Sequence, residues 1–320
     1  MSFSPLGPIL TPTITLLSTL VVLLIIILYH IYLPPSYLIR YVSRLYPTVL
    51  FHLPTTKPIL MLTIDDVPST HTARIAEILH AHNIHATFFV IGSQIPGHES
   101  TLRSLVAQGH ELANHAMYDK PSFRLSDEVL EREIKEVEGR VKEIYDHQSV
   151  LVDDDDDDDD DDNDDEGDHT ATATDMSTRT IGPVRIPPRY FRPGSGFFTA
   201  RMLALLSSLE YKCVLGSIYP HDAQIRWSWL NTWHILRSVR PGGIVICHDR
   251  PWTPKMLEVV LPELKRRGFS VGSLSEGRKW EGVEDAGEGE EEDAVSRGAG
   301  GQSEQERLDK MGGGERVKRS

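Results

Sequence analysis

The sequence predicts an α/β fold with a parallel sheet or barrel, preceded by one membrane-spanning helix. Short apolar runs alternate with segments of helical periodicity between residues 59 and 272. Repeated strand and helix units of this kind are typical of parallel sheets and barrels. The chain has 320 residues, of which 40% are hydrophobic. One full-sized core is therefore possible, with length left over for tails and insertions.

The N-terminal segment, residues 1–36, contains an apolar stretch over residues 14–33. About 20 such residues suffice to cross a bilayer. A cleaved signal peptide is the alternative, but the basic n-region, the short apolar core and the small-residue cleavage site are missing. We therefore expect a retained, single-pass anchor. Its orientation stays open, because Arg40 and Arg44 place the domain in the cytosol by the positive-inside rule, whereas processing of an external polymer needs the other side.

Residues 37–57 are predicted to form a connector, because Pro34 and Pro35 end the helix. The catalytic domain is expected over residues 58–275, with the alternation of elements described above. Its predicted strands cover residues 59–64, 86–91, 111–114, 186–191, 212–215, 243–247 and 269–272, and its predicted helices cover residues 70–82, 101–108, 126–144, 199–209, 229–239 and 254–267.

An insertion over residues 152–182 and a tail over residues 276–320 are expected to be disordered, because neither holds enough apolar surface to fold. Residues 153–168 contain fourteen acidic side chains and no Lys or Arg, which accounts for the whole formal charge of −14. The rest of the chain has no basic surplus to neutralise phosphates. Nucleic acid is therefore excluded as a partner.

Two carboxylates, Asp65 and Asp66, follow directly on the first predicted strand. Parallel folds collect their chemistry at strand ends. Adjacent side chains there point different ways, so one carboxylate can bind a cation while the other reaches a water beside it. The alternative is an ordinary turn opened by Asp and closed by Pro68.

An imidazole and a carboxylate, His115 and Asp119, follow the third predicted strand four residues apart. Within one turn of helix these side chains share a face and suit two ligands of one divalent metal. Together with Asp66 they predict a three-ligand site with open positions for water and substrate. Among fourteen histidines the spacing alone also arises by chance.

Two further strand ends carry polar groups. His248 ends the run Ile244–Cys247, where a lone histidine is more often a hydrogen-bonded core residue than a catalyst. Arg192 follows the predicted strand 186–191 and precedes Pro193-Gly194-Ser195-Gly196. Such an arginine can hold a carboxylate bidentately, and the glycine-flanked amides can approach an oxyanion.

In this order the four motifs resemble the polysaccharide deacetylase family built on the NodB homology domain, which includes chitin and peptidoglycan deacetylases. The resemblance runs from about Pro58 to Glu276 without the acidic insertion, and it includes the closing stretches HDRPWT and LPELKRRGF. It implies a distorted (β/α) barrel. It also implies a metal-dependent hydrolase that removes N-acetyl groups from an N-acetylglucosamine-containing, chitin-like polysaccharide and releases acetate.

The resemblance also implies a role for each site residue. By it, Asp65 is the general base, His248 the general acid and Arg192 the partner that holds Asp65. The remaining implied roles are metal ligation by Asp66, His115 and Asp119, oxyanion binding by the amide of Ser195, an acetyl pocket lined by Ile246, and tuning of the acid by Asp222 as a candidate.

Departures from the family pattern keep alternatives open. Asp119 stands where the family usually has a second histidine, so the one divalent ion expected is Zn²⁺ or, at this harder site, Co²⁺, Mn²⁺ or Fe²⁺. Val67 replaces a usual Gly, and Gly194 and Ser195 replace Pro and Tyr. The alternatives are a hydrolase of a small amide or O-acetyl ester, a carbohydrate-binding domain without turnover, and a membrane protein whose charged segments recruit partners.

Overall fold

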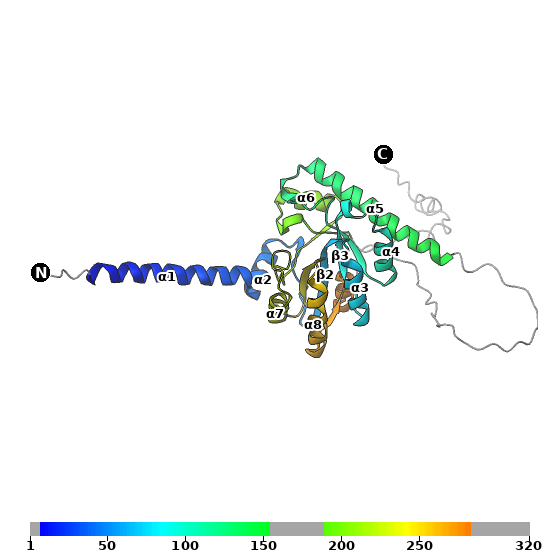
Figure 1. The fold of residues 1–320 in the computed structure, drawn as a ribbon. Helices are drawn as coiled ribbons and strands as arrows, with labels where there is room; N and C mark the ends of the chain where they lie inside the picture. The colour runs from blue at the N-terminus through cyan, green and yellow to red at the C-terminus, as the bar shows by residue number, and fades with distance from the viewer. Residues whose placement is uncertain (1–6, 154–188, 283–320) are drawn as a thin grey trace, which may run out of the picture. The chain divides into compact units, whose positions relative to one another are not determined.

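The computed structural model describes residues 7–153 and 189–282. Apart from their first few residues, the predicted insertion and tail lie outside these ranges. Within them, eight strands form one sheet in the order β1-β6-β5-β4-β3-β2-β7, and β8 also pairs with β2 (Figure 1). Every pair of strands is parallel. The sheet curls into a half-barrel, which confirms the predicted α/β class.

The centre of the sheet is β2, whose nine residues are all buried. Leu60, Leu62 and Ile64 belong to one core cluster and Ile59 and Met61 to another, so both faces of β2 are covered, as its continuous apolar run requires. The strands are β1 (Val49–Leu50), β2 (Ile59–Val67), β3 (Thr87–Val90), β4 (Glu111–Asn114), β5 (Tyr190–Phe191), β6 (Lys212–Val214), β7 (Gly243–His248) and β8 (Ser270–Gly272).

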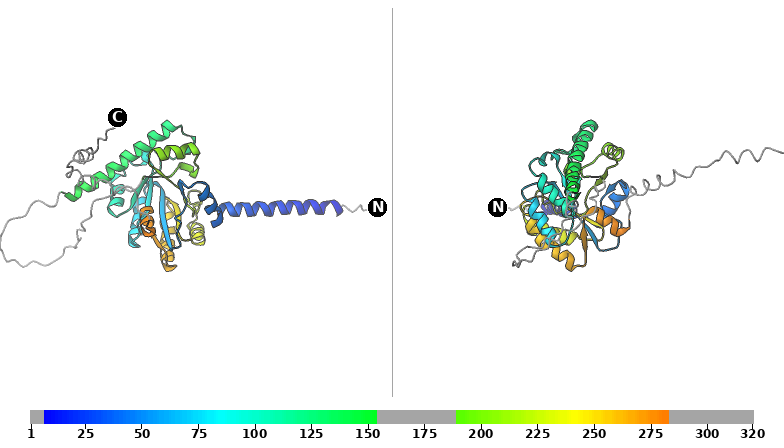
Figure 2. Two further views of the ribbon diagram at one scale, coloured as in Figure 1. Left: turned by 180° about the vertical axis from the view of Figure 1, so that it is seen from behind. Right: turned by 90° about the vertical axis from the view of Figure 1, so that its right-hand side faces the viewer.

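The helices of the domain pack apolar stripes against the sheet (Figure 2). The described helices are α1 (Gly7–Tyr32), α2 (Ser36–Leu45), α3 (Thr72–Ala81), α4 (Glu99–Ala107), α5 (Asp127–Asp153), α6 (Ala200–Ser208), α7 (Ser228–Ser238), α8 (Thr253–Arg266) and α9 (Leu274–Glu281), with short 3-10 turns at Gly92–Gln94, Ser122–Arg124 and Gly194–Gly196. The largest core cluster joins α3, α4, α5 and α8 to the central strands. On α5, the predicted stripe that includes Leu130, Ile134 and Val137 is fully buried.

Helix α1 contains a 19-residue stretch, Ile14–Tyr32, that is long and apolar enough to cross a membrane. None of this stretch is buried against the protein. A signal sequence would meet the same criteria of length and composition. Pro34 and Pro35 separate α1 from α2, as predicted.

The structured chain extends past both expected ends of the domain. Residues 37–57, the predicted connector, include most of α2 and all of β1, and β1 pairs with β6. Phe51 and Leu53 are buried in the core. A two-residue strand has no periodicity by which the sequence could reveal it. At the other end, α9 continues to Glu281, past the expected boundary at residue 275.

A buried carboxylate connects α9 to the sheet. Ser273 caps α9 and donates its hydroxyl to Glu111 Oε1 at 2.5 Å, while Thr87 Oγ1 donates to Glu111 Oε2 at 2.8 Å. The backbone N–H of Ser275 donates to the same carboxylate at 3.2 Å. Burial raises the pKa of Glu111 above its usual value, and these donors oppose that rise. The last helix is therefore held by polar contacts to β3 and β4.

We predict that Ser273→Ala lowers the free energy of unfolding by about 1–2 kcal/mol, because it removes both a helix cap and a partner of a buried carboxylate. Chemical denaturation of the full chain measures this. Ser207→Ala is the control, because Ser207 is exposed on α6 and does not contact Glu111. Equal losses in the two variants would contradict the proposed role of Ser273.

Candidate active site

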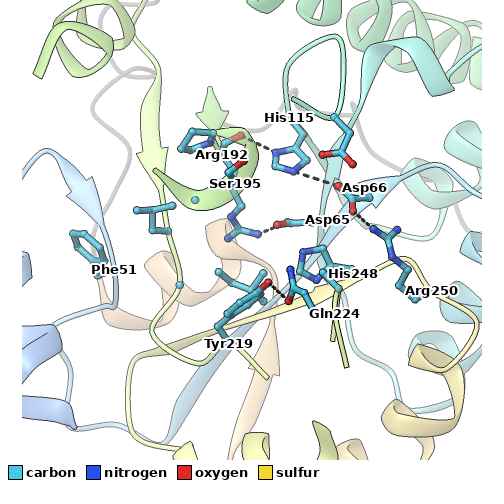
Figure 3. A pocket seen from close by; sticks show the side chains of 17 residues that line it. Phe51, Asp65, Asp66, His115, Arg192, Ser195, Tyr219, Gln224, His248 and Arg250 are labelled. Atoms are coloured by element: carbon cyan, nitrogen blue, oxygen red, sulfur yellow. Dashed lines mark hydrogen bonds and ion pairs between the residues drawn. The ribbon is translucent and has the colours of Figure 1, made fainter. Parts of the chain in front are cut away.

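A cavity of about 650 Å³ lies where the parallel strands end (Figure 3). Each of four strand ends contributes to it, since Asp65 and Asp66 are on β2, His115 follows β4, Arg192 follows β5 and His248 ends β7. Of the nine predicted site residues, eight line this cavity: Asp65, Asp66, His115, Asp119, Arg192, Ser195, Ile246 and His248. The ninth, Asp222, lies behind His248.

The Arg192 side chain holds Asp65 inside the sheet. Arg192 is only 2% exposed, and its Nη1 donates to Asp65 Oδ1 in a close ion pair and to Thr63 Oγ1 at 2.9 Å. Its Nε donates to the carbonyl of Val214 at 3.2 Å, and its guanidinium lies 4.0 Å from the centre of the Phe89 ring. These contacts fix the position of the Asp65 carboxylate. The hold is not bidentate, because Arg192 Nη2 has no hydrogen-bond partner among the described residues.

Asp66 and His115 face each other across 3.5 Å, measured from Oδ1 to Nε2. Asp66 has a φ of 61°, a left-handed conformation that a non-glycine residue adopts at a cost of roughly 1–2 kcal/mol. On its other side, His115 Nδ1 is 2.7 Å from the carbonyl oxygen of Arg192. Because a carbonyl only accepts, Nδ1 carries the proton and Nε2 is directed at Asp66.

This pair fits a cation. A neutral His115 presents a lone pair at Nε2 to a carboxylate oxygen, and 3.5 Å is beyond the usual length of an N–H···O bond. Two facing acceptors need a proton or a cation between them. Without a metal, the carboxylates of Asp66 and Asp65 outweigh the effect of burial and raise the pKa of His115. Burial also favours neutral Asp66, but His115, His248 and Arg250 hold the pKa of that carboxyl well below its usual range.

The third predicted ligand is less constrained. Asp119 lines the same cavity but is exposed, on the loop that follows β4. Within residues 7–153 and 189–282, no group of three or more His, Cys, Asp or Glu side chains is arranged to hold a metal ion. The structure thus brings Asp66 and His115 together and leaves Asp119 at the rim.

One charged residue of the cavity, Arg250, was missed by the sequence reasoning, as were the uncharged lining residues Phe51, Tyr219 and Gln224. Arg250 lies two residues past the end of β7 and donates from Nη2 to Asp66 Oδ2 at 2.5 Å. It also lines the cavity. Its only signal in the sequence is a basic side chain directly after His248-Asp249, which does not reveal which carboxylate it meets.

The Asp222 carboxylate orients His248 with both of its oxygens. Oδ1 lies 2.8 Å from His248 Nδ1, and Oδ2 accepts the backbone N–H of His248 at 2.7 Å. Burial alone would lower the pKa of His248, but Asp222, with Asp65 and Asp66, raises it to about 9. The imidazole is therefore protonated at neutral pH, and Nε2 is the nitrogen left to face the cavity. The sequence had offered Asp222 only as a candidate for this position.

The turn Gly194–Gly196 carries the predicted oxyanion donor. Ser195 has a φ of 68° and lines the cavity. A Cβ on Gly194 would lie 2.2 Å from the carbonyl oxygen of Lys120, so a side chain cannot be accommodated there. Opposite, Ile246 lines the cavity beside Gly216, whose absent Cβ leaves room for the Ile246 side chain, 2.3 Å from where that atom would lie.

The known proteins that this chain resembles are described as deacetylases. Residues 52–152 match the family model described as polysaccharide deacetylase. A peptidoglycan-N-acetylglucosamine deacetylase of Bacillus cereus is 26% identical over 73% of this chain and 95% of its own. A chitooligosaccharide deacetylase of Rhizobium leguminosarum bv. trifolii is 28% identical over 67% of this chain and 89% of its own.

The fold also matches solved structures. The crystal structure of a protein described as a CE4 family pseudoenzyme from Bacillus anthracis superposes with a TM-score of 0.56 at 19% identity, covering 72% of this chain and 68% of that one. At this identity the match establishes the fold alone. Because a pseudoenzyme shares the fold, activity has to be argued from the side chains of the site.

We predict that Asp222→Asn lowers the pKa of His248 from about 9 towards or below its usual 6.5, since burial then acts with less opposition. An NMR titration of the imidazole measures this. Because the folded-state pKa is raised, the pair stabilises the fold fully below pH 6.5 and loses that contribution as the pH rises through 9. The unfolding free energy of the variant should depend less on pH in that window.

The matched control for this titration is Asp119→Asn, which removes a carboxylate that lines the same cavity without contacting His248. It should leave the pKa of His248 near that of the wild type. A similar fall in both variants would show that the cavity as a whole, and not the Asp222 contact, sets the protonation of His248.

Proposed function

Because the chain carries a domain of the polysaccharide deacetylase family, we propose that it is a metal-dependent hydrolase of N-acetyl groups. The proposed substrate is an N-acetylglucosamine-containing, chitin-like polysaccharide, and the proposed products are acetate and a free amine. The observation that carries this proposal is the convergence of Asp65, Asp66, His115, Arg192 and His248 on one cavity. The names of the two curated relatives, which refer to N-acetylglucosamine and chitooligosaccharides, support the substrate class.

Asp65 is proposed to be the general base. Its carboxylate is held by Arg192, so one oxygen is occupied and the carboxylate is kept in one orientation. It would accept a proton from water as the water oxygen attacks the acetamide carbon. Asp66 and His115, with Asp119 as the expected third ligand, would hold the divalent ion, Zn²⁺ or Co²⁺, Mn²⁺ or Fe²⁺. Such an ion supplies Lewis acidity and lowers the pKa of a nearby water.

His248 is proposed to be the general acid. A pKa of about 9 keeps it protonated at neutral pH, as an acid for an amine leaving group requires. Its proton would pass to the nitrogen as the carbon–nitrogen bond breaks. The backbone N–H of Ser195 would stabilise the negative charge on the former carbonyl oxygen, and Ile246 would contact the acetyl methyl group.

We also propose that α1 is a retained anchor and the protein a single-pass membrane protein. The length of the apolar span supports this. So does the contact at its end, where the carbonyl oxygen of Tyr32 lies 2.7 Å from His234 Nε2 in the domain. The side of the membrane on which the domain lies is left open.

The decisive measurement is release of acetate from chitin oligomers by the full chain in detergent with added Zn²⁺, Co²⁺ or Mn²⁺. Asp65→Asn keeps the shape of the base but not its basicity, and His248→Ala removes the acid, so each should lower kcat by a factor of about 10²–10⁴. Asp127→Asn, an exposed residue at the start of α5, is the control and should keep full activity.

Small amides and O-acetylated sugars belong in the same assay. Turnover of these, without turnover of chitin oligomers, would replace the proposed substrate with the alternative class. Binding of glycan with no turnover of any substrate would overturn the catalytic proposal and leave a carbohydrate-binding domain.

We predict about one divalent ion per chain, bound through Asp66 and His115. Asp66→Ala and His115→Ala should each lose it after dialysis, whereas Asp65→Asn should keep it and yet be inactive. Elemental analysis of the purified full chain decides this. Wild-type metal content in both alanine variants would contradict the proposed site, and Asp119→Ala in the same series tests the third ligand.

A further inference from the structure

Helix α7 and the residue before it expose three tryptophan side chains. Trp227, Trp229 and Trp233 are 63%, 69% and 46% exposed, and the rings of Trp227 and Trp229 stack with centroids 6.4 Å apart. Single exposed apolar residues are normal on a protein surface, but adjoining large ones indicate a surface that meets a partner. Exposing a large indole ring to water is unfavourable, so a partner that covers these rings would lower the free energy of the surface.

The charged side chains on α7 and directly before it are positive. Trp229, Trp233 and Arg237 are spaced four residues apart, so they share one face of α7, and the exposed Arg226 precedes it. Neither arginine forms an ion pair with a carboxylate among the described residues. Between Asp222 and Asp249 the sequence contains no Asp or Glu. The face of α7 therefore combines aromatic rings with unneutralised guanidinium groups.

Helix α2 has the same composition on its outer face. Tyr37, Tyr41 and Leu45 are 66%, 59% and 54% exposed, while the inner face packs on the core. The exposed charges on α2 are Arg40 and Arg44, and no Asp or Glu precedes residue 65 in the sequence. Two helices far apart in the chain thus present aromatic, apolar and basic side chains without a carboxylate.

Both helices adjoin the end of the apolar span. α2 begins four residues after Tyr32, the last residue of that span. Tyr32 also contacts α7, because its carbonyl oxygen is 2.7 Å from His234 Nε2 and the two rings meet edge to face at 4.9 Å. The Tyr32 ring stacks on His221 at 5.0 Å. Figures 1 and 2 show α2 and α7 at the end of the domain that α1 joins.

We propose that the outer faces of α2 and α7 lie in the headgroup region of the bilayer that α1 crosses. This juxtamembrane face consists of Tyr37, Arg40, Tyr41, Arg44 and Leu45 on α2 and of Arg226, Trp227, Trp229, Trp233 and Arg237 on or beside α7. Tryptophan and tyrosine favour the membrane interface, where the ring is shielded and the polar edge stays wet. The arginines favour an anionic lipid surface. The proposal rests on the retained anchor.

The position of the face bears on the candidate active site. Ala223 and Gln224 line the cavity, and Trp227 follows only three residues later. His221, on which Tyr32 stacks, precedes Asp222, the residue that orients His248. When this face lies on the membrane, the cavity therefore lies beside the membrane surface. The acetylated substrate would then be bound close to the lipid headgroups.

The test uses tryptophan fluorescence of the full chain in lipid nanodiscs. All five tryptophans belong to the domain and none to the apolar span, so quenching by brominated lipids reports contact of the domain itself. We expect strong quenching in the wild type, stronger with anionic than with zwitterionic brominated lipid. Trp227→Ser, Trp229→Ser and Trp233→Ser combined should abolish most of it, and Arg226→Ser with Arg237→Ser should remove the preference for anionic lipid.

Trp280→Phe is the matched control, because Trp280 is 38% exposed but lies on α9, and it should leave the quenching by lipid in place. Wild-type fluorescence that responds to acrylamide and not to brominated lipid would overturn the proposal. Protection of the three tryptophans by chitin oligomers in place of lipid would assign the face to the glycan instead, which also overturns it.

The same samples separate this proposal from the proposed function. The triple tryptophan variant should release acetate from short, soluble chitin oligomers at the wild-type rate, since none of the three residues lines the cavity. Lipid contact without acetate release would support the juxtamembrane face and overturn the proposed reaction. Acetate release without lipid contact would support the reaction and overturn the proposed face.

Discussion

The buried guanidinium of Arg192 holds the carboxyl ends of the strands in one arrangement. It leaves β5, meets Asp65 and Thr63 of β2, donates to the end of β6 and lies against Phe89 of β3. Its own carbonyl fixes the ring of His115 after β4. A charge this deeply buried is stable only while its partners are in place. The positions of Asp65, of His115 and of the strand ends therefore depend on one another through Arg192.

A second, separate polar pair sets the other half of the site. His248 ends β7 beside Asp65 in register, but its protonation is controlled from the loop that carries Asp222. The two carboxylates differ in what they contact, since Asp65 meets a permanent cation and Asp222 meets a titratable one. The first contact holds Asp65 in one orientation, and the second raises the pKa of His248. The proposed general acid and base chemistry needs a carboxylate and an imidazole in such different surroundings side by side.

The sequence was informative where chemistry depends on a strand end. Asp65, Asp66, His115 and His248 each follow an apolar run, and parallel strands bring such ends to one edge, so their convergence could be predicted. Asp222 and Arg250 lie on loops, whose path no periodicity describes, and their contacts could not be derived. The strand β1 was not predicted either, because two residues are too few to show a periodic pattern. The barrel class itself came from the order of the motifs and not from any one of them.

The balance of charge in the cavity bears on whether turnover is retained. Asp65 is neutralised by Arg192, Asp66 by Arg250, and Asp222 by protonated His248. Each of these carboxylates has its own cation, and Asp119 is a further carboxylate in the cavity lining. A divalent ion held there would exceed the charge of Asp119 and give the cavity a net positive charge, which would favour an anionic transition state. Arg250 takes only one oxygen of Asp66, and the other, Oδ1, still faces His115. The Arg250 guanidinium therefore leaves free the Asp66 oxygen that a cation would need. The Arg250 contact is thus compatible with an active site.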